Sequence, residues 1–545
     1  MEKRRLLGIV ILVIVICFAL TRFFVVLWAD RVPPIHDPLS LHNLSRLLFE
    51  AVKGKEGGFD VFLSHLNNNA YPPLIHYTAL PFLAIFGPEK GAESSFALYL
   101  AILLLSVYGI GHRFAGRRAG ILAVSFALFT PLLDSVSRIY MVDYALAAIT
   151  AMTVYLLFKS EGFSRRGYSI LLALAACVGM FTKQSFILYA GFPLAFCVLF
   201  HLIKTPKQER KAVIINIVFF VLIVGSISLV YYLPKLANFF ADRRQVNAFY
   251  DDIEGDSYRI FPYVWLLIRD GLGPVLALGA LVGFFVNART RGYWVLWHWA
   301  IPPILFIDAF HPFESPRYLL PILPAFVVIF AVGLESLVKK IKPRMADLFC
   351  LIALIVVLGA FWVNVGLHGT QRFSFDDFHA RFQEKGMPRP EKLDWNVDEP
   401  VRKIISGSDM GKVVLLLNSP YSEVLQGALL DIDPFADVDA LIERASVGSA
   451  PDKLKEAESL SAYLDSARWV LFHSEFRRDP RYLNFTGPID PKVVGPVFDR
   501  FFEVKHQFEL AGKYPYPEGE GDVLLYERIA NPESAEHETP ADQQQ

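Results

Sequence analysis

The sequence has little charge and almost no cysteine. Only 20% of its 545 residues are charged and 54% are hydrophobic, whereas about 25% of an average soluble domain is charged. This composition excludes an ordinary soluble domain as the main architecture. The four cysteines stand inside apolar runs with no metal-binding or disulfide spacing, which excludes a zinc ribbon and a disulfide framework. They are Cys17, Cys177, Cys197 and Cys350.

Motifs of soluble energy-coupled enzymes are also missing. The sequence contains no Gly-x-x-x-x-Gly-Lys phosphate loop and no His-Glu-x-x-His zinc motif. We therefore expect neither ATP hydrolysis nor that type of zinc peptidase. No internal repeat is apparent, although repeats are common in secondary transporters. A nucleic-acid partner is not expected.

Long apolar runs are what the sequence does contain. A membrane-spanning helix needs roughly 20 mainly apolar residues. The first run, Leu6 to Trp28, follows Met-Glu-Lys-Arg-Arg. It is too long for a signal peptide and no cleavage site follows it, so it predicts an uncleaved helix. Ten further runs raise the expected number of spans to about eleven. They lie near residues 95–112, 119–133, 141–158, 168–182, 185–203, 213–233, 271–287, 292–309, 318–337 and 346–366.

The loops between these runs predict the orientation. Cytoplasmic loops carry an excess of Lys and Arg. With the N-terminus inside, every inside loop is basic. These loops are residues 112–118, 159–166, 204–211, 287–291 and 339–344. A span at Pro72 to Phe86 would reverse every later loop, so we expect an interfacial or re-entrant helix there, within a long first outer loop at 29–94.

The chain becomes more polar after Leu367. Residues 413–417 and 469–472 are short apolar stretches typical of buried strands. Residues 502–510 alternate with period two, and 522–528 are their expected partner across a turn at 514–519. We predict a small α/β domain at 367–530 on the outer side, followed by a disordered tail at 531–545. Residues 1–366 form the predicted transmembrane domain.

Two acids are candidate functional residues, because charge near a membrane core is costly. Asp37 begins the first outer loop and could take a proton from an acceptor hydroxyl. It could equally cap a helix that starts at Pro38. Asp143 enters the fourth span within its first turns, where an acid also suits the helix dipole. The residues alone leave both alternatives open.

Two basic residues are candidate phosphate ligands. Lys183 stands on the outer side between two spans, where a positive charge departs from the charge bias. It could bind a phosphate or reach the lipid headgroups. Arg317 precedes the tenth span and could hold a phosphate with its planar guanidinium. The loop at 234–270 carries charges of both signs and is expected to be solvated.

Several segments, in this order, resemble the C-type fold (GT-C) glycosyltransferases related to protein O-mannosyltransferases, aminoarabinose transferases and rhizobial lipopolysaccharide-core glycosyltransferases. The resemblance covers residues 1–366. It rests on Asp37, on Asn69-Ala-Tyr71-Pro-Pro-Leu-Ile-His76-Tyr, on Phe86-Gly87, on 112–121, on Thr130-Pro131, on 138–143, on 179–185 and on 317–324.

The resemblance implies roles for individual residues. Asp37 corresponds to the catalytic base, and Asp143 to an acid near the reacting sugars. Lys183, Arg317 and Arg138 would hold the phosphate of the donor. Some relatives bind a metal through an acid just before the Pro-Pro pair, but here Ala70 and Tyr71 stand there. His36, His76 and Tyr71 could contact the substrate or a divalent metal, so metal dependence is left open.

The predicted function follows from these roles. The chain would transfer a sugar from a polyprenyl-phosphate donor to a hydroxyl of a glycolipid, polysaccharide or protein, with inversion. It would lie in the inner (plasma) membrane with a cytoplasmic N-terminus and a periplasmic or extracellular C-terminal domain. The alternative is a lipid or sugar transporter, or a flippase, without transferase activity. A transporter would not need the long first outer loop or a large outer domain.

Overall fold

The computed structural model divides the chain into two compact units. One consists of Met1–Asp30 and Leu44–Glu391, and the other of Arg31–Asn43 and Lys392–Gln545. The structure describes residues 2–29, 36–54, 72–88, 90–236, 261–287, 292–310, 315–339, 398–406, 412–416, 438–440, 464–473, 500–515 and 522–529, with positions 63, 290, 348 and 352. The predicted domain boundary near residue 366 lies outside the described residues and stays a prediction.

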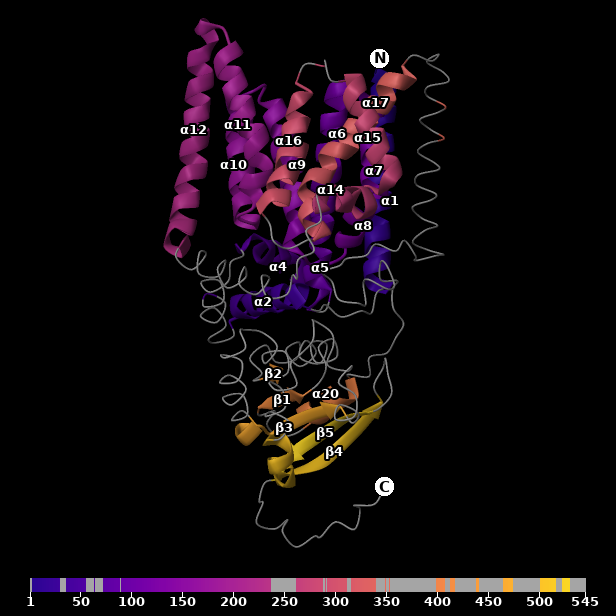
Figure 1. The fold of residues 1–545 in the computed structure, drawn as a ribbon, viewed down its shortest axis with the longest axis vertical. Coiled ribbons are helices and arrows are strands. Elements are labelled where there is room, and N and C mark those ends of the chain that lie inside the picture. Colours follow the sequence, from indigo (N-terminus) through magenta and orange to yellow (C-terminus); the bar gives the residue numbers. More distant parts are fainter. Residues whose placement is uncertain are drawn as a thin grey trace. The chain divides into compact units, whose positions relative to one another are not determined.

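The first unit is a bundle of long helices that run alongside one another (Figure 1). Its long helices are α1 (Glu2–Ala29), α6 (Phe96–Ala115), α7 (Arg117–Phe129), α9 (Val142–Lys159), α10 (Arg166–Thr182), α11 (Phe186–Lys204), α12 (Lys207–Tyr232), α15 (Gly273–Asn287), α16 (Trp294–Phe310) and α17 (Leu323–Val338). Shorter helical elements are α4 (Leu74–Phe86), α5 (Gly91–Ser94), α8 (Pro131–Val136), η1 (Leu233–Lys235), α14 (Pro262–Leu266), η2 (Leu267–Gly271) and η3 (Pro316–Ile322). Helix α2 (His36–Val52) is shared, because its residues from Leu44 onward belong to this unit.

The bundle is that of a multi-pass membrane protein. Among the described residues, six helices are long and apolar enough to cross a membrane. A seventh span would be formed by α14 with η2 and α15, which are bent by 108° at a break. The remaining predicted spans at 119–133, 168–182 and 292–309 correspond to α7, α10 and α16, which have 13, 17 and 17 residues. The last predicted span, at 346–366, lies outside the described ranges except for positions 348 and 352.

Large apolar side chains cover the outside of the bundle. Val230 on α12 is 79% exposed, Val275 on α15 is 76% exposed and Ile85 on α4 is 72% exposed. Only 11% of the most apolar window of α12 is buried inside the protein. A soluble protein rarely exposes such an apolar surface, but lipid tails solvate it without penalty. The surface therefore independently supports insertion in a bilayer.

Helices α15 and α17 approach each other through glycine. A side chain at Gly333 would place its Cβ 2.3 Å from the Cα atom of Gly283. Small residues at such crossings let two backbones approach closely in a membrane. Beyond this crossing, the Ser336 hydroxyl donates to Asn287 Oδ1 over 2.8 Å. The crossing holds α17 against the bundle. This helix forms most of the tenth predicted span, which follows Arg317.

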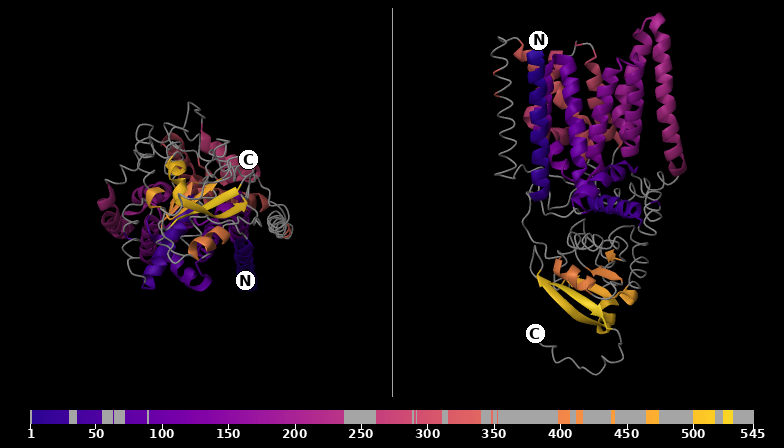
Figure 2. Two further views of the ribbon diagram at one scale, coloured as in Figure 1. Left: turned by 90° about the horizontal axis from the view of Figure 1, so that it is seen from below. Right: turned by 180° about the vertical axis from the view of Figure 1, so that it is seen from behind.

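The described parts of the five predicted basic loops, which include only residues 287 and 290 of one loop and residue 339 of another, gather at one end of the bundle. Gly8 of α1 lies against the Arg117 side chain, and Lys339 Nζ donates to the carbonyl oxygen of Ala115. Gly162 lies against the His201 ring, which joins the α9–α10 loop to the end of α11. The Ser336–Asn287 hydrogen bond joins the last turn of α17 to the last residue of α15, and the remaining two predicted loops follow these helix ends. Figures 1 and 2 show the N-terminus and the α11–α12 turn at this same end. We call it the basic end.

Helices α4 and α5 and the later part of α2 lie at the opposite end of the bundle, which we call the paired end (Figure 1). Helix α4 has 13 residues with Pro81 inside it. At 1.5 Å per residue it is about 20 Å long, which is shorter than the ~30 Å hydrocarbon core. Its length suits the predicted interfacial or re-entrant position of 72–86.

The second unit contains a five-stranded sheet in the order β2-β1-β3-β5-β4. Strands β1 (Val413–Leu416), β2 (Val438–Ala440) and β3 (Trp469–His473) are parallel, while β4 (Phe508–Pro515) and β5 (Asp522–Arg528) are antiparallel neighbours. Helix α20 (Asp398–Ile405) contacts β4. Val413, Val414 and Leu415 of β1 are fully buried, as in a parallel strand covered on both faces. The predicted small α/β domain is confirmed as a fold.

One predicted strand was placed too early. Residues 500–504 are helical and Lys505–Gln507 form a 3-10 turn, so β4 begins only at Phe508. The buried residues of this stretch are Phe501, Val504 and Phe508, which have the three- and four-residue spacing of a helix. Alternating apolar residues at 502–510 also fit this helical spacing, so the pattern alone did not distinguish a helix from a strand. The antiparallel pairing with 522–528 was predicted correctly.

Candidate active site

The start of α9 and the end of α10 hold a buried ion pair. Asp143 lies in the first turn of α9, and Lys183 follows the last residue of α10 in an extended conformation. Lys183 Nζ donates to Asp143 Oδ1 over 2.7 Å, and the two residues are only 6% and 1% exposed. The second carboxylate oxygen, Asp143 Oδ2, is buried and accepts no hydrogen bond from the described part of the protein. Lys183 is therefore not the lone cation that its sequence position suggested.

Arg317 and Lys183 both lie against one tyrosine. Lys183 Nζ is 5.4 Å from the centroid of the Tyr318 ring, and the guanidinium carbon of Arg317 is 5.3 Å from the same centroid. The Tyr189 hydroxyl donates to the Tyr318 backbone oxygen over 2.8 Å, which fixes η3 on α11. Cations gain attraction from an aromatic face at this range. Two candidate phosphate ligands, far apart in sequence, are thus brought together around Tyr318.

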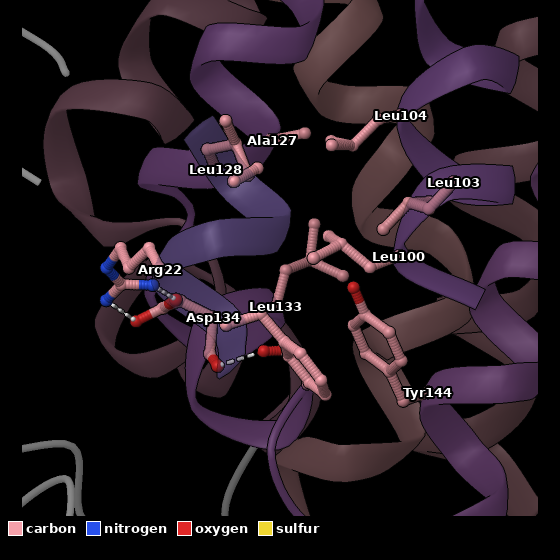
Figure 3. Close-up of a pocket in the computed structure, with 12 residues that line it drawn as sticks. Arg22, Leu100, Leu103, Leu104, Ala127, Leu128, Leu133, Asp134 and Tyr144 are labelled. Atoms are coloured by element: carbon pink, nitrogen blue, oxygen red, sulfur yellow. Dashed lines mark hydrogen bonds and ion pairs between the residues drawn. The ribbon is translucent and has the colours of Figure 1, made fainter. Parts of the chain in front are cut away.

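A second buried charge cluster lies on α1 and α8. Arg22 donates two hydrogen bonds to the Asp134 carboxylate, over 2.5 and 2.9 Å. Arg138 Nη2 is 3.8 Å from the same carboxylate. A cavity of about 20 Å³ beside this cluster is lined by Arg22, Asp134, Ser137 and Tyr144 among apolar neighbours (Figure 3). It has room for about one water molecule, so it is too small to hold a sugar.

His76 belongs to a buried hydrogen-bond chain. Its Nδ1 atom is 2.7 Å from Ser45 Oγ, which is 2.8 Å from the Tyr140 hydroxyl. Its ring is fully buried. Helix α2 begins at His36, two residues before the predicted start at Pro38, so Asp37 is its second residue and not its N-cap. Tyr71 lies outside the described residues, so its predicted role stays a prediction.

A break in the bundle places another cation near these elements. The π-helical segment η2 contains Arg269 and contacts both η3 and α8. Irregular backbone at membrane depth is tolerated where it is covered by protein or lines a cavity. The break therefore adds Arg269 to the cations of the paired end. The charge pattern of residues 234–270, which include Arg269, predicts a solvated loop instead.

The described residues hold no group of three His, Cys, Asp or Glu side chains that could bind a metal ion. His76 Nδ1 is engaged by Ser45, so only its Nε2 atom could serve as a ligand. The predicted metal contacts at His36 and Tyr71 remain predictions.

Comparison with known proteins agrees with this architecture. A family model described as dolichyl-phosphate-mannose-protein mannosyltransferase matches residues 70–231. The crystal structure of ArnT from Cupriavidus metallidurans bound to undecaprenyl phosphate superposes with a TM-score of 0.58 at 14% identity, covering 95% of this chain and 98% of that one. Archaeal oligosaccharyltransferase AglB from Archaeoglobus fulgidus, in complex with an inhibitory peptide and a dolichol-phosphate, has a TM-score of 0.54 at 11% identity, with 99% and 75% coverage. No curated protein sequence matches the chain.

The chain has the C-type glycosyltransferase fold. The predicted fold class is therefore correct. In this GT-C chain the matched family segment contains Asp134, Arg138, Asp143 and Lys183. Both buried charge clusters thus draw residues from the segment on which the family model rests.

Sequence reasoning missed two charged residues of the GT-C bundle. Arg22 stands inside the first apolar run and Asp134 directly follows the predicted span at 119–133. The cost of an unpaired charge in the membrane could have identified both. Their pairing across 112 residues could not be read from the sequence.

Proposed function

We propose that this protein transfers a sugar from a polyprenyl-phosphate donor to an acceptor hydroxyl at the outer face of the inner (plasma) membrane. The carrying observation is the buried Asp143–Lys183 pair, which shares the Tyr318 ring with Arg317 at the paired end. Undecaprenyl phosphate and dolichol-phosphate are bound by the structural neighbours, and this supports a lipid-phosphate donor. The acceptor is a glycolipid, a polysaccharide or a protein.

The proposed orientation follows from the two ends of the bundle. We assign the five basic loops to the cytoplasm, which supports an outside position for the paired end. The N-terminus is then cytoplasmic, and the site faces the periplasm or the cell exterior. A lipid-linked sugar in the outer leaflet would reach this site without leaving the bilayer.

The proposed reaction is a direct displacement. The acceptor oxygen forms a bond to the anomeric carbon while the bond from that carbon to the carrier phosphate breaks. The electron pair of the broken bond leaves with the phosphate, and the acceptor proton passes to the Asp37 carboxylate. Attack opposite the leaving group inverts the anomeric carbon.

Fixed cations stabilise the charge that develops on the leaving phosphate. Lys183 and Arg317 supply two of them, and Arg138 is the third proposed phosphate ligand. Asp143 holds the Lys183 ammonium group in one place, so that little reorganisation is needed during the reaction. Its second oxygen, which has no described partner, can accept a hydrogen bond from a sugar hydroxyl or amino group.

Reconstitution in detergent tests this function against transport. Mass spectrometry of glycolipids first identifies the species that deletion of the gene removes and the wild-type gene restores. Detergent-solubilised purified protein is then mixed with a lipid extract of the deletion cells. A transferase forms the missing species in micelles, where no membrane barrier exists. A transporter or flippase forms none, and that result would overturn the proposal.

A further inference from the structure

Three buried side chains form a hydrogen-bond relay between separate elements. Ser45 on α2, His76 on α4 and Tyr140 in the turn before α9 are each at most 1% exposed. The Tyr140 hydroxyl donates to the Ile75 backbone oxygen over 2.9 Å. Ser45 Oγ lies 2.8 Å from that hydroxyl and 2.7 Å from His76 Nδ1. We call Tyr140, Ser45 and His76 the relay.

The three contacts have a consistent assignment of hydrogens. The Tyr140 hydroxyl donates to the Ile75 backbone oxygen, which can only accept. With Ser45 donating to Tyr140, the His76 tautomer that carries a hydrogen on Nδ1 donates to Ser45.

The relay ends next to the ion pair. Residues 137–141 are not helical, and α9 begins at Val142, one residue before Asp143. Tyr140 stands two residues before the first residue of α9, and the centroid of its ring lies 5.3 Å from that of Phe96. A shift of this turn would move the Asp143 carboxylate relative to Lys183. A displacement of about 1 Å in an active site can lower the rate by about 100-fold.

We propose that Tyr140, Ser45 and His76 are positioning residues, which hold the first turn of α9 so that Asp143 and Lys183 meet the donor in productive geometry. This proposal rests on the proposed transferase function. Ser45 also lies eight residues after Asp37 on α2. The relay therefore ties the later part of α2, from Leu44 onward, to the turn before α9.

A second tyrosine hydroxyl that contacts α4, the helix of His76, provides a matched control. The Tyr99 hydroxyl is 2.8 Å from Thr78 Oγ1, and Thr78 also donates to the Ile75 backbone oxygen. This second tyrosine–hydroxyl contact is similarly buried at Tyr99, which is 1% exposed. It joins α4 to α6, and its link to the turn before α9 is indirect, through the Ile75 backbone oxygen and the Phe96 ring. Tyr140→Phe and Tyr99→Phe thus each remove one buried tyrosine hydroxyl beside α4.

The test compares turnover with lipid binding. Each variant is purified, matched for folded amount by size-exclusion chromatography, and assayed with the deletion-cell lipid extract. Binding of undecaprenyl phosphate is measured by native mass spectrometry. Tyr140→Phe should lower turnover by about 10- to 100-fold with undecaprenyl phosphate affinity kept within about threefold. Tyr99→Phe should retain turnover.

Two further variants test the relay as one unit. Ser45→Ala should match Tyr140→Phe, and the double variant should be no worse than either, because residues that act together are non-additive. His76→Asn keeps a donor near Nδ1 and should retain more turnover than His76→Gln, whose amide lies near Nε2. Equal turnover of Tyr140→Phe and Tyr99→Phe, or additive losses in the double variant, would overturn the relay alone. A wild-type protein that forms no product would overturn the proposed function and the relay together.

Discussion

The two ends of the membrane bundle carry their charges in different ways. At the basic end the Glu161–Arg165 pair is exposed, with side chains 45% and 55% exposed, and the partly exposed Arg118 pairs with the one buried charge described there, Glu335. At the paired end, Arg22 and Asp134 are 5% and 8% exposed, and Lys183 and Asp143 are 7% and 2% exposed. Exposed cations cost nothing to solvate and suffice to orient a protein in a membrane. Buried charges must be held by partners, and their arrangement indicates a site for chemistry.

The difference between the two ends depends most strongly on the orientation of the protein in the membrane. Cysteine introduced at Ser164, in an exposed loop of the basic end, should not react with a membrane-impermeant maleimide in intact cells. Cysteine introduced at Lys53, which is exposed in the turn just after α2, should react fully. The protein without introduced cysteines gives the background. Labelling of Ser164→Cys with protection of Lys53→Cys would reverse the assignment of the two ends.

The next largest effect is expected at Asp37. Asp37→Asn keeps the size of the side chain and its suitability for a helix N-terminus, but it cannot accept a proton. Turnover should fall by about 100-fold or more, the scale of general-base catalysis. The assay is product formation from the deletion-cell lipid extract at matched folded amounts. Turnover near that of wild type would remove Asp37 from the mechanism and make Asp143 the leading candidate for the base.

Stability should respond differently at the two ends. Arg22→Met leaves the Asp134 carboxylate buried without its bidentate partner and should lower the free energy of unfolding by about 3–5 kcal/mol. Arg165→Met removes an exposed pair and should cost less than about 1 kcal/mol. Thermal unfolding of the two purified variants in one detergent checks this difference. Equal shifts in Tm would show that the buried ion pair contributes no more to stability than the exposed one.

The contrast between the ends also marks how far the sequence could be interpreted. Apolar runs and basic loops depend on local composition, so the membrane fold and the grouping of the loops could be predicted. Asp143 and Lys183 could each be selected, because a charge beside a membrane core is costly. Their contact depends on how α9 and α10 pack, which no local pattern records. The contact between Arg22 and Asp134 likewise depends on helix packing. So does the relay, in which only His76 was a candidate from the sequence.

The second unit shows a related limit. The run at 413–417 could be recognised as a strand because a short continuous apolar run is typical of a strand covered on both faces, and Val413, Val414 and Leu415 are fully buried. The three-residue strand β2 (Val438–Ala440) is too short to show a period, so it was missed. The start of β4 was misplaced because two periods overlapped at 501–508. The existence of β2 and the start of β4 are both determined by strand pairing, which depends on residues far away in the chain.

The central claim is that the Asp143–Lys183 pair serves the transfer reaction and not only the fold. The most direct test replaces both members by apolar residues of similar size, as Asp143→Leu with Lys183→Met. Replacing a whole buried ion pair in this way is often neutral or stabilising, so the double variant should remain folded, with Tm at or above that of wild type. We predict that it forms no detectable product from the deletion-cell lipid extract and binds undecaprenyl phosphate at least tenfold more weakly. A folded double variant with turnover near that of wild type would contradict the claim.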